Sequence, residues 1–163
     1  MPERPSPPER PGPAREPPAL DAADRRILAA VEHEGRITIA ELASRVGLSK
    51  SPTQARLRRL EAAGVIRGWR AVLDPRAMGR EHVAFVEVRL QDTREAALAA
   101  FNKAVRAIPE IEACHMIAGS FDYLLKVRTA GMAEYRTALA ERVSTVPHVA
   151  ATSTYVAMET VKE

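Results

Sequence analysis

Apolar residues recur three and four positions apart through the first part of the chain, which is the spacing of helices that pack along one face. This spacing predicts three short helices, over residues 21–35, 38–47 and 49–64. Asp21 and Thr38 are residue types that cap helix N-termini. Asp24 places a second negative charge near the positive end of the first helix, and Glu41 is placed to complete a capping box with Thr38. The pattern therefore predicts a small all-helical unit with defined helix starts.

Alternation of apolar and polar residues replaces the helical spacing further along the chain. We expect a strand over residues 66–73, ended by Asp74 and Pro75. The later elements follow a β-α-β-β-α-β order: strand 83–90, helix 93–108, strands 110–118 and 121–128 joined by a tight turn at Gly119-Ser120, helix 132–146 and strand 149–158. This is the ferredoxin-like order, so the expected fold class is α+β.

The predicted sheet has one face for its two helices and a second face without a partner in the chain. Val83 and Phe85 lie on this second face, because side chains alternate along a strand. A second copy of the sheet is the simplest cover for them, so we expect a homodimer.

Composition separates a tail from the two predicted domains. Eight of the twelve prolines lie in residues 1–20, where proline opposes helix and ladder hydrogen bonds. We expect a disordered Pro-rich tail there, and a Pro-rich segment that docks on another protein is the alternative. The predicted divisions are the tail 1–20, a helical domain 21–65, a hinge strand and linker 66–80, and a second domain 81–163.

The formal net charge of +3 is concentrated in one segment. Residues 21–75 hold ten basic and seven acidic side chains, whereas residues 1–20 and 76–163 are each neutral. A local excess of basic residues is typical of a protein that binds a polyanion. The single cysteine, Cys114, excludes an internal disulfide. With neither a long apolar run nor a signal-like N-terminus in view, we expect a cytoplasmic protein with no membrane partner.

The third predicted helix carries basic residues and follows a turn, residues 46–49, that is typical of a helix-turn-helix motif. In such motifs the start of the helix reads base edges in double-stranded DNA, and its N–H groups can hold a phosphate. The candidates near the helix start are Ser49, Lys50, Ser51, Thr53 and Gln54. The candidate phosphate anchors are Arg56, Arg58 and Arg59. A basic, solvated helix face that packs only on its own domain is the alternative.

Catalysis is not expected. The four histidines show no HExxH-like metal spacing, and the chain has neither a phosphate loop nor a nucleophile elbow. Cys114 and His115 are neighbours on a predicted strand, so their side chains point to opposite faces. We therefore expect neither a catalytic site, a metal site nor a cofactor.

These motifs resemble the leucine-responsive/asparagine-regulator family, Lrp/AsnC. The DNA-binding half is similar to residues 20–75, LDAADRRILAAVEHEGRITIAELASRVGLSKSPTQARLRRLEAAGVIRGWRAVLDP. The effector-sensing half, a ferredoxin-like RAM or ACT-like domain, is similar to residues 112–128, EACHMIAGSFDYLLKVR, and 154–163, TYVAMETVKE. The resemblance is to the leucine-responsive branch more than to the asparagine branch. The Pro-rich tail lies outside it.

The resemblance implies a winged helix-turn-helix transcriptional regulator that acts at specific sites in amino-acid metabolism genes. It implies homodimers that assemble into octamers, a nucleoid-associated location, and an amino-acid effector, leucine or another amino acid. An architectural DNA-binding protein with little sequence specificity is the alternative. The basic third helix disfavours a stand-alone amino-acid-binding protein.

The resemblance also implies effector contacts between neighbouring sensing domains. The matching positions are Gly119, Ser120, Phe121, Asp122, Met132, Tyr155 and Val156. Asp122 can accept hydrogen bonds from an ammonium group, and backbone N–H groups around Gly119 and Ser120 can hold a carboxylate. Met132 can line an apolar pocket. On the residues alone, Asp122 as a hairpin cap and Met132 as a core residue remain the alternative.

Overall fold

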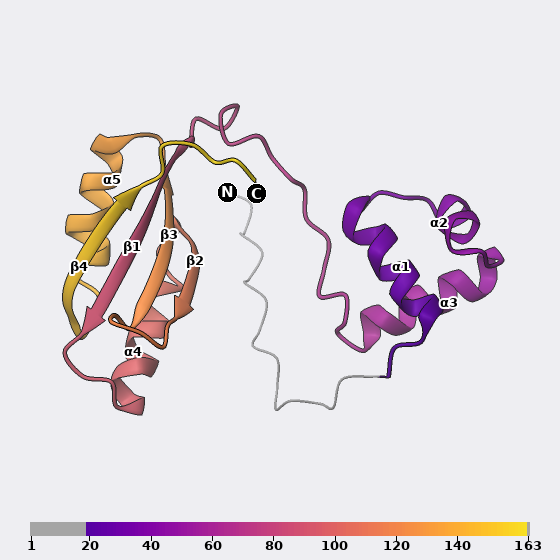
Figure 1. The fold of residues 1–163 in the computed structure, drawn as a ribbon, viewed down its shortest axis with the longest axis horizontal. Coiled ribbons are helices and arrows are strands. Elements are labelled where there is room, and N and C mark those ends of the chain that lie inside the picture. The colour runs from indigo at the N-terminus through magenta and orange to yellow at the C-terminus, as the bar shows by residue number, and fades with distance from the viewer. Residues whose placement is uncertain (1–18, 163) are drawn as a thin grey trace, which may run out of the picture. The chain divides into compact units, whose positions relative to one another are not determined.

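The computed structural model describes residues 19–162, which divide into two compact units between Ala71 and Val72 (Figure 1). The expected disordered tail lies outside the described residues, except for its last two, Ala19 and Leu20.

The first unit consists of three helices in its described part: α1 (Ala22–His33), α2 (Ile39–Val46) and α3 (Lys50–Ala62). The predicted capping box at Thr38 and the predicted N-cap at Asp21 are confirmed, and Asp24 makes the start of α1 a capping box as well. The Asp24 amide donates to Asp21 Oδ1 at 2.8 Å, and the Glu41 amide donates to Thr38 Oγ1 at 3.2 Å. Each box satisfies N–H groups that the first turn of a helix leaves unpaired.

A small apolar core holds the three helices together. Its buried members include Ile27 from α1, Leu42 from α2 and Leu60 from α3. Gly47 ends α2 in the left-handed region, at φ 70° and ψ 37°, which a β-carbon would disfavour. The predicted turn between α2 and α3 is therefore present.

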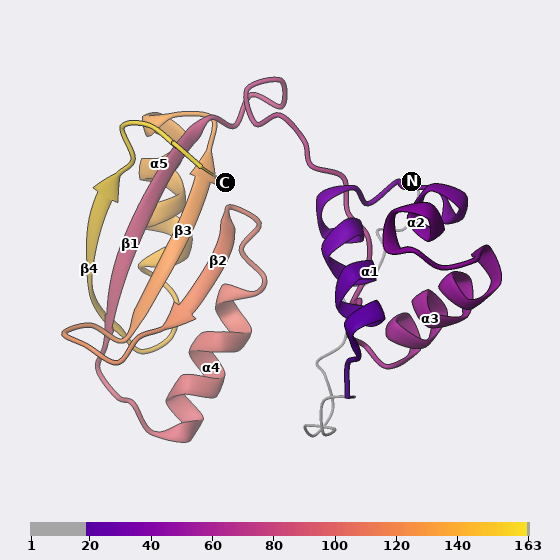
Figure 2. The same ribbon diagram turned by 45° about the vertical axis from the view of Figure 1, so that its right-hand side comes forward.

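The second unit is a four-stranded antiparallel sheet with strand order β2-β3-β1-β4 (Figure 2). Its elements are β1 (His82–Leu90), α4 (Glu95–Val105), β2 (Ile111–Met116), β3 (Tyr123–Thr129), α5 (Met132–Ala138) with a π-helical turn (Leu139–Val143), and β4 (Val149–Val156). The predicted ferredoxin-like order is confirmed.

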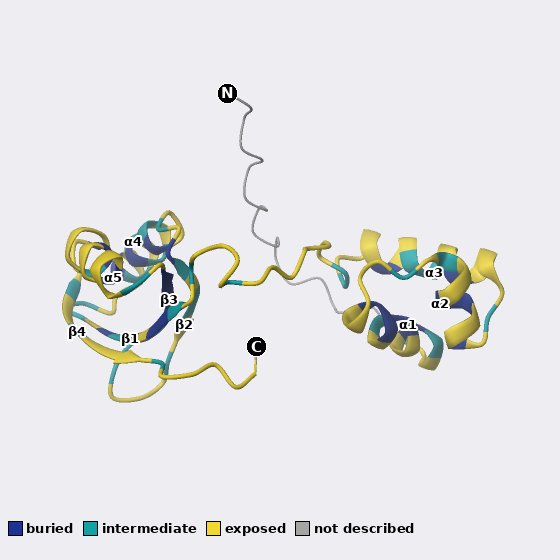
Figure 3. Cartoon of the chain, turned by 90° about the horizontal axis from the view of Figure 1, so that it is seen from above, coloured by how far each residue is buried: buried dark blue, intermediate teal, exposed yellow. Residues whose placement is uncertain are grey.

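Helices α4 and α5 lie on the same side of this sheet (Figure 3). Val86 and Val88 of β1 pack against this layer, where Phe101 of α4 is fully buried. On the opposite face, Phe85 and Tyr155 are cross-strand partners and are 38% and 55% exposed. Val83, expected to be open on that face, is buried already within the chain. The apolar area left uncovered there therefore centres on Phe85 and Tyr155.

The prediction of a strand over residues 66–73 is wrong, because that segment contains no strand. Val72 and Leu73 are 95% and 61% exposed. A strand is stable only when a second strand takes up its N–H and C=O groups, and no strand among residues 19–162 pairs with this segment. The apolar residues of this segment alone did not distinguish a strand from an extended linker.

The predicted hairpin between β2 and β3 is confirmed, but its turn is longer than expected. The connection spans residues 117–122 and is closed by the Ile117 amide, which donates to the Asp122 carbonyl at 2.9 Å. Gly119-Ser120 is therefore the middle of a loop.

Candidate nucleic-acid interface and effector site

Exposed polar residues form a stripe along one face of α3. Lys50, Gln54 and Arg58 follow one another at intervals of four residues, so they lie on one side of the helix. Ser51 beside them is also exposed. Among residues 19–162, neither Lys50 nor Arg58 has an ion-pair partner. This stripe can offer hydrogen bonds and positive charge to a nucleic acid.

The start of α3 is also open. Ser49 is its N-cap residue, is exposed, and makes no capping hydrogen bond with its side chain. The first-turn N–H groups of a helix lack partners within the helix and attract anions. This end can therefore accept a phosphate beside the exposed stripe.

Thr53 lies on the opposite, buried side of α3. Its side chain is fully buried, and its hydroxyl donates to the Ser49 carbonyl at 2.9 Å. The expectation that Thr53 reads a base edge is therefore not met by the geometry. Helical periodicity explains the difference, because Thr53 and Leu60 are seven residues apart and share the core side.

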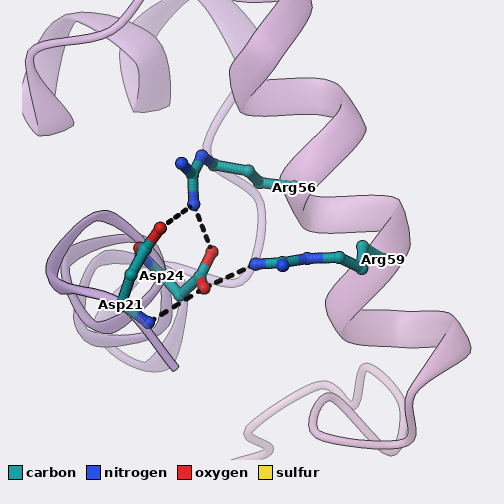
Figure 4. Close-up of polar contacts among 4 residues, drawn as sticks. All are labelled: Asp21, Asp24, Arg56 and Arg59. Atoms are coloured by element: carbon teal, nitrogen blue, oxygen red, sulfur yellow. Dashed lines mark hydrogen bonds and ion pairs between the residues drawn. The ribbon is translucent and has the colours of Figure 1, made fainter. Parts of the chain in front are cut away.

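Arg56 and Arg59 point toward the start of α1 (Figure 4). Arg56 Nη1 lies 2.6 Å from Asp21 Oδ2 and 2.9 Å from Asp24 Oδ1. Arg59 Nη2 lies 2.5 Å from Asp24 Oδ2. Both guanidinium groups, expected to be open for phosphates, are thus paired within the unit.

The two aspartates are held in their charged forms. Burial opposes ionisation of Asp24, but hydrogen bonds from Arg59 and Arg56 hold the pKa of this carboxyl below its ordinary value. The backbone amide of Asp24, followed by the Arg56 guanidinium, lowers the pKa of Asp21 to about 2. The same carboxylates that cap α1 therefore bind α3.

We expect Asp21→Asn to destabilise the first unit at neutral pH and to lose this effect in acid. Asparagine also caps helices well, so the change mainly removes charge. A carboxyl with a lowered pKa stabilises the fold above its ordinary value, 3.8, and loses this contribution as pH falls toward about 2. Urea melts between pH 7 and pH 2 should show the two proteins converging. A difference in stability that stays constant over this range would contradict the assignment.

The sequence pattern did not reveal a contact that Trp69 makes. Its indole N–H donates to Glu61 Oε1 at 3.1 Å, so the segment after α3 is tied back to α3. A single tryptophan in a polar segment was the available signal.

The β2–β3 loop holds four of the seven expected effector residues. Gly119 and Ser120 are exposed, and Phe121 is half-buried. Asp122 Oδ2 accepts the Leu90 amide at 2.7 Å, and the Asp122 amide donates to the Val88 carbonyl at 2.9 Å. Oδ2 of Asp122 thus ties the β2–β3 loop to the end of β1, a contact that differs from the hairpin cap considered as the alternative.

The other three expected effector residues lie toward the opposite end of the sheet. Tyr155 and Val156 face Phe85 and Ala84 across the β1–β4 pair. Met132 begins α5 just after β3 and is 50% exposed, so it is not a core residue. Phe85 and Val88 are roughly 10 Å apart at the rise of a strand. A single chain therefore does not gather all seven residues around a small ligand.

Cys114 and His115 do not form a dyad. Cys114 packs against the core of the second unit, and burial raises the pKa of its thiol to about 11. His115 is exposed on the next position of β2. Within residues 19–162, no cluster of three or more histidine, cysteine or acidic side chains could hold a metal ion. Nor does any helix of that part have the length and apolar character needed to cross a membrane.

A helix-turn-helix unit with an exposed basic stripe, joined to a ferredoxin-like unit, defines a two-part DNA-binding regulator. Residues 20–67 match the model of a winged helix-turn-helix DNA-binding domain, and residues 83–163 match that of the Lrp/AsnC ligand binding domain. The chain belongs to the Lrp/AsnC family of transcriptional regulators.

Relatives at high identity cover nearly the whole chain. The proline dehydrogenase transcriptional activator of Rhodobacter capsulatus is 58% identical over 144 residues, which are 88% of this chain and 94% of the relative. The leucine-responsive regulatory protein of Escherichia coli is 44% identical over 144 residues, 88% of either chain.

A solved structure supports the fold over both units. The transcriptional regulator of Neisseria meningitidis in complex with L-methionine has a TM-score of 0.83 at 30% sequence identity. The match covers 89% of this chain and 94% of that one. The expected family and fold are thus confirmed, with relatives named as regulators of transcription.

Proposed function

We propose that this protein activates transcription of a proline dehydrogenase gene in response to an amino acid. Two relatives named proline dehydrogenase transcriptional activator are 58% and 56% identical to it. Those named leucine-responsive regulatory protein are 43–44% identical. This difference in sequence identity is the reason for proposing a proline dehydrogenase gene as the target.

The exposed stripe on α3 supports a specific mode of DNA contact. With α3 in the major groove, Gln54 can pair bidentately with adenine and Lys50 can donate to guanine. Ser51 can add a hydroxyl for hydrogen bonding to the DNA. Arg58 can contact a phosphate, and the N-terminus of α3 at Ser49 can hold a second phosphate. Contacts to base edges provide specificity, and contacts to phosphates provide affinity.

The effector site is proposed to form between protomers. Asp122 and the loop amides of one sensing domain would meet Met132, Tyr155 and Val156 of a neighbour, because a single domain keeps these groups apart. The ligand-binding domain and the methionine complex of the Neisseria relative support an amino-acid ligand. We expect proline, the substrate that the enzyme's name gives, ahead of leucine.

The open face of the sheet supports a homodimer as the basic assembly. Phe85 and Tyr155 are adjacent, large and exposed there. Covering them removes apolar area from water. Octamers built from such dimers would place the sensing domains next to one another. The assembly is proposed to act in the cytoplasm, at the nucleoid.

Phe85→Glu is expected to weaken the dimer by roughly tenfold or more, because it loses the burial of a large side chain and adds a charge. Light scattering coupled to size-exclusion chromatography over a dilution series measures the effect. Lys103→Glu, at an exposed position of α4, is the matched control and should stay dimeric. An unchanged dimer in Phe85→Glu would place the interface elsewhere.

The gene assignment is tested in a deletion strain with a reporter on the promoter of its own proline dehydrogenase gene. Wild-type protein should restore proline-dependent expression, whereas the Lys50→Ala/Arg58→Ala variant should not. Calorimetric titration with proline, leucine and methionine identifies the effector. Full expression in the deletion strain would rule out the proposed activation.

A further inference from the structure

Arg56 and Arg59 lie on a different side of α3 from the exposed stripe. Successive residues of a helix turn by about 100°, so Arg58 points about 200° away from Arg56 and about 100° away from Arg59. Lys50 and Gln54 share the side of Arg58. A DNA groove that receives the stripe therefore contacts Arg58 directly. Arg56 and Arg59 then point away from the floor of that groove.

Both oxygens of the Asp24 carboxylate are occupied by partners within the unit. Oδ1 accepts from Arg56, and Oδ2 accepts from Arg59 at 2.5 Å and from the Asp21 amide at 3.2 Å. The Asp24 side chain has no solvent exposure, whereas Arg56 and Arg59 are 31% and 57% exposed. The buried charge of Asp24 therefore depends on the two arginines.

This pairing changes the charge that α3 offers to DNA. The guanidinium groups of Arg56 and Arg59 are balanced by the carboxylates of Asp21 and Asp24 (Figure 4). Moving either arginine onto a phosphate would leave the buried Asp24 with fewer partners, and an unpaired buried charge is strongly unfavourable. Lys50 and Arg58 carry no such restraint among residues 19–162.

We propose that Arg56 and Arg59 are positioning residues, which fix the orientation of α3 on α1 through Asp24 and bind no phosphate in the DNA complex. The proposal rests on the proposed placement of α3 in the major groove. The contacts of Arg56 and Arg59 with Asp24 then contribute to sequence discrimination without touching DNA. The reason is that the direction of α3 decides which base edges Lys50 and Gln54 reach.

The test counts phosphate contacts through the salt dependence of DNA binding. Fluorescence anisotropy is measured between 50 and 300 mM KCl with two duplexes of equal length. One is selected from a random pool by the wild-type protein, and the other is an unrelated sequence. The variants are Arg56→Gln, Arg59→Gln and, as the matched control on the same helix, Arg58→Gln. Circular dichroism melts set a temperature at which each variant is folded.

Losing one phosphate contact lowers the magnitude of the negative slope of log K against log salt by about 0.9. We expect this change for Arg58→Gln only. Arg56→Gln and Arg59→Gln should keep the wild-type slope, but should lower the preference for the selected duplex by about tenfold. Arg59→Gln loses a single, half-exposed contact, so it keeps the test possible if Arg56→Gln does not fold.

A slope whose magnitude falls by about 0.9 in Arg56→Gln or Arg59→Gln would show a phosphate anchor and overturn the proposal. An unchanged slope with an unchanged preference would also overturn it, because the pair would then be purely structural. An unchanged slope in Arg58→Gln is a separate outcome, which would contradict the proposed placement of α3 on DNA.

Discussion

Leu42→Ala is expected to unfold the helical unit and to abolish DNA binding while the second unit stays folded. Leu42 is fully buried at the centre of the cluster that includes Ile27 and Leu60. Truncating a buried leucine costs about 2–5 kcal/mol. A domain of this size has a small margin, because stability is commonly only about 5–15 kcal/mol and small domains bury less of their surface.

Circular dichroism should show a loss of helix signal in this variant, and anisotropy should show no binding to duplex DNA. Ser44→Ala is the matched control, since Ser44 is exposed on the same helix and its truncation leaves the core intact. Light scattering should still report the wild-type assembly. DNA binding retained by a folded Leu42→Ala protein would mean that the core of this unit is not what holds α3 in place.

Phe101→Ala should have the converse effect: loss of the sensing unit with the helical unit retained. Phe101 is fully buried in α4, and its ring lies 4.3 Å from that of Tyr123, centroid to centroid. Replacing a buried phenylalanine by alanine costs about 3–5 kcal/mol. We expect assembly and effector binding to be lost. DNA binding should weaken rather than vanish, because the remaining helical units bind one at a time.

Calorimetry and light scattering measure these two losses, with Lys103→Ala, exposed on the same helix, as the control. The helix signal of the first unit should persist. An effector response that survives in a monomeric Phe101→Ala protein would contradict the proposal that the effector site forms between protomers.

The sequence predicted those parts of the molecule that local rules determine. Asp21 and Thr38 cap their helices as expected, because a capping box needs only residues within one turn. The order of strands and helices in the second unit likewise follows from hydrophobic periodicity. Helical periodicity also separates the exposed side of α3, with Lys50, Gln54 and Arg58, from the buried side, but the sequence prediction did not apply it to Thr53.

Contacts between distant segments could not be predicted in this way. The pairing of Arg59 with Asp24 joins residues that are 35 positions apart, and it depends on how α3 crosses α1. Residues 66–73 contain strand-forming apolar residues, but only a pairing partner would make the segment a strand. The expected effector residues were matched by resemblance, whereas their distribution over two ends of the sheet follows from strand register.

This chain is proposed to be a sequence-specific regulator that acts through α3. The most direct measurement is the ratio of affinities for its own proline dehydrogenase promoter and for a shuffled duplex of equal length, at 150 mM KCl. Specific regulators commonly prefer their sites by about 1,000-fold or more. We predict a ratio in that range, reduced by Gln54→Ala. A ratio near one for the wild-type protein would contradict the claim and indicate an architectural DNA-binding protein.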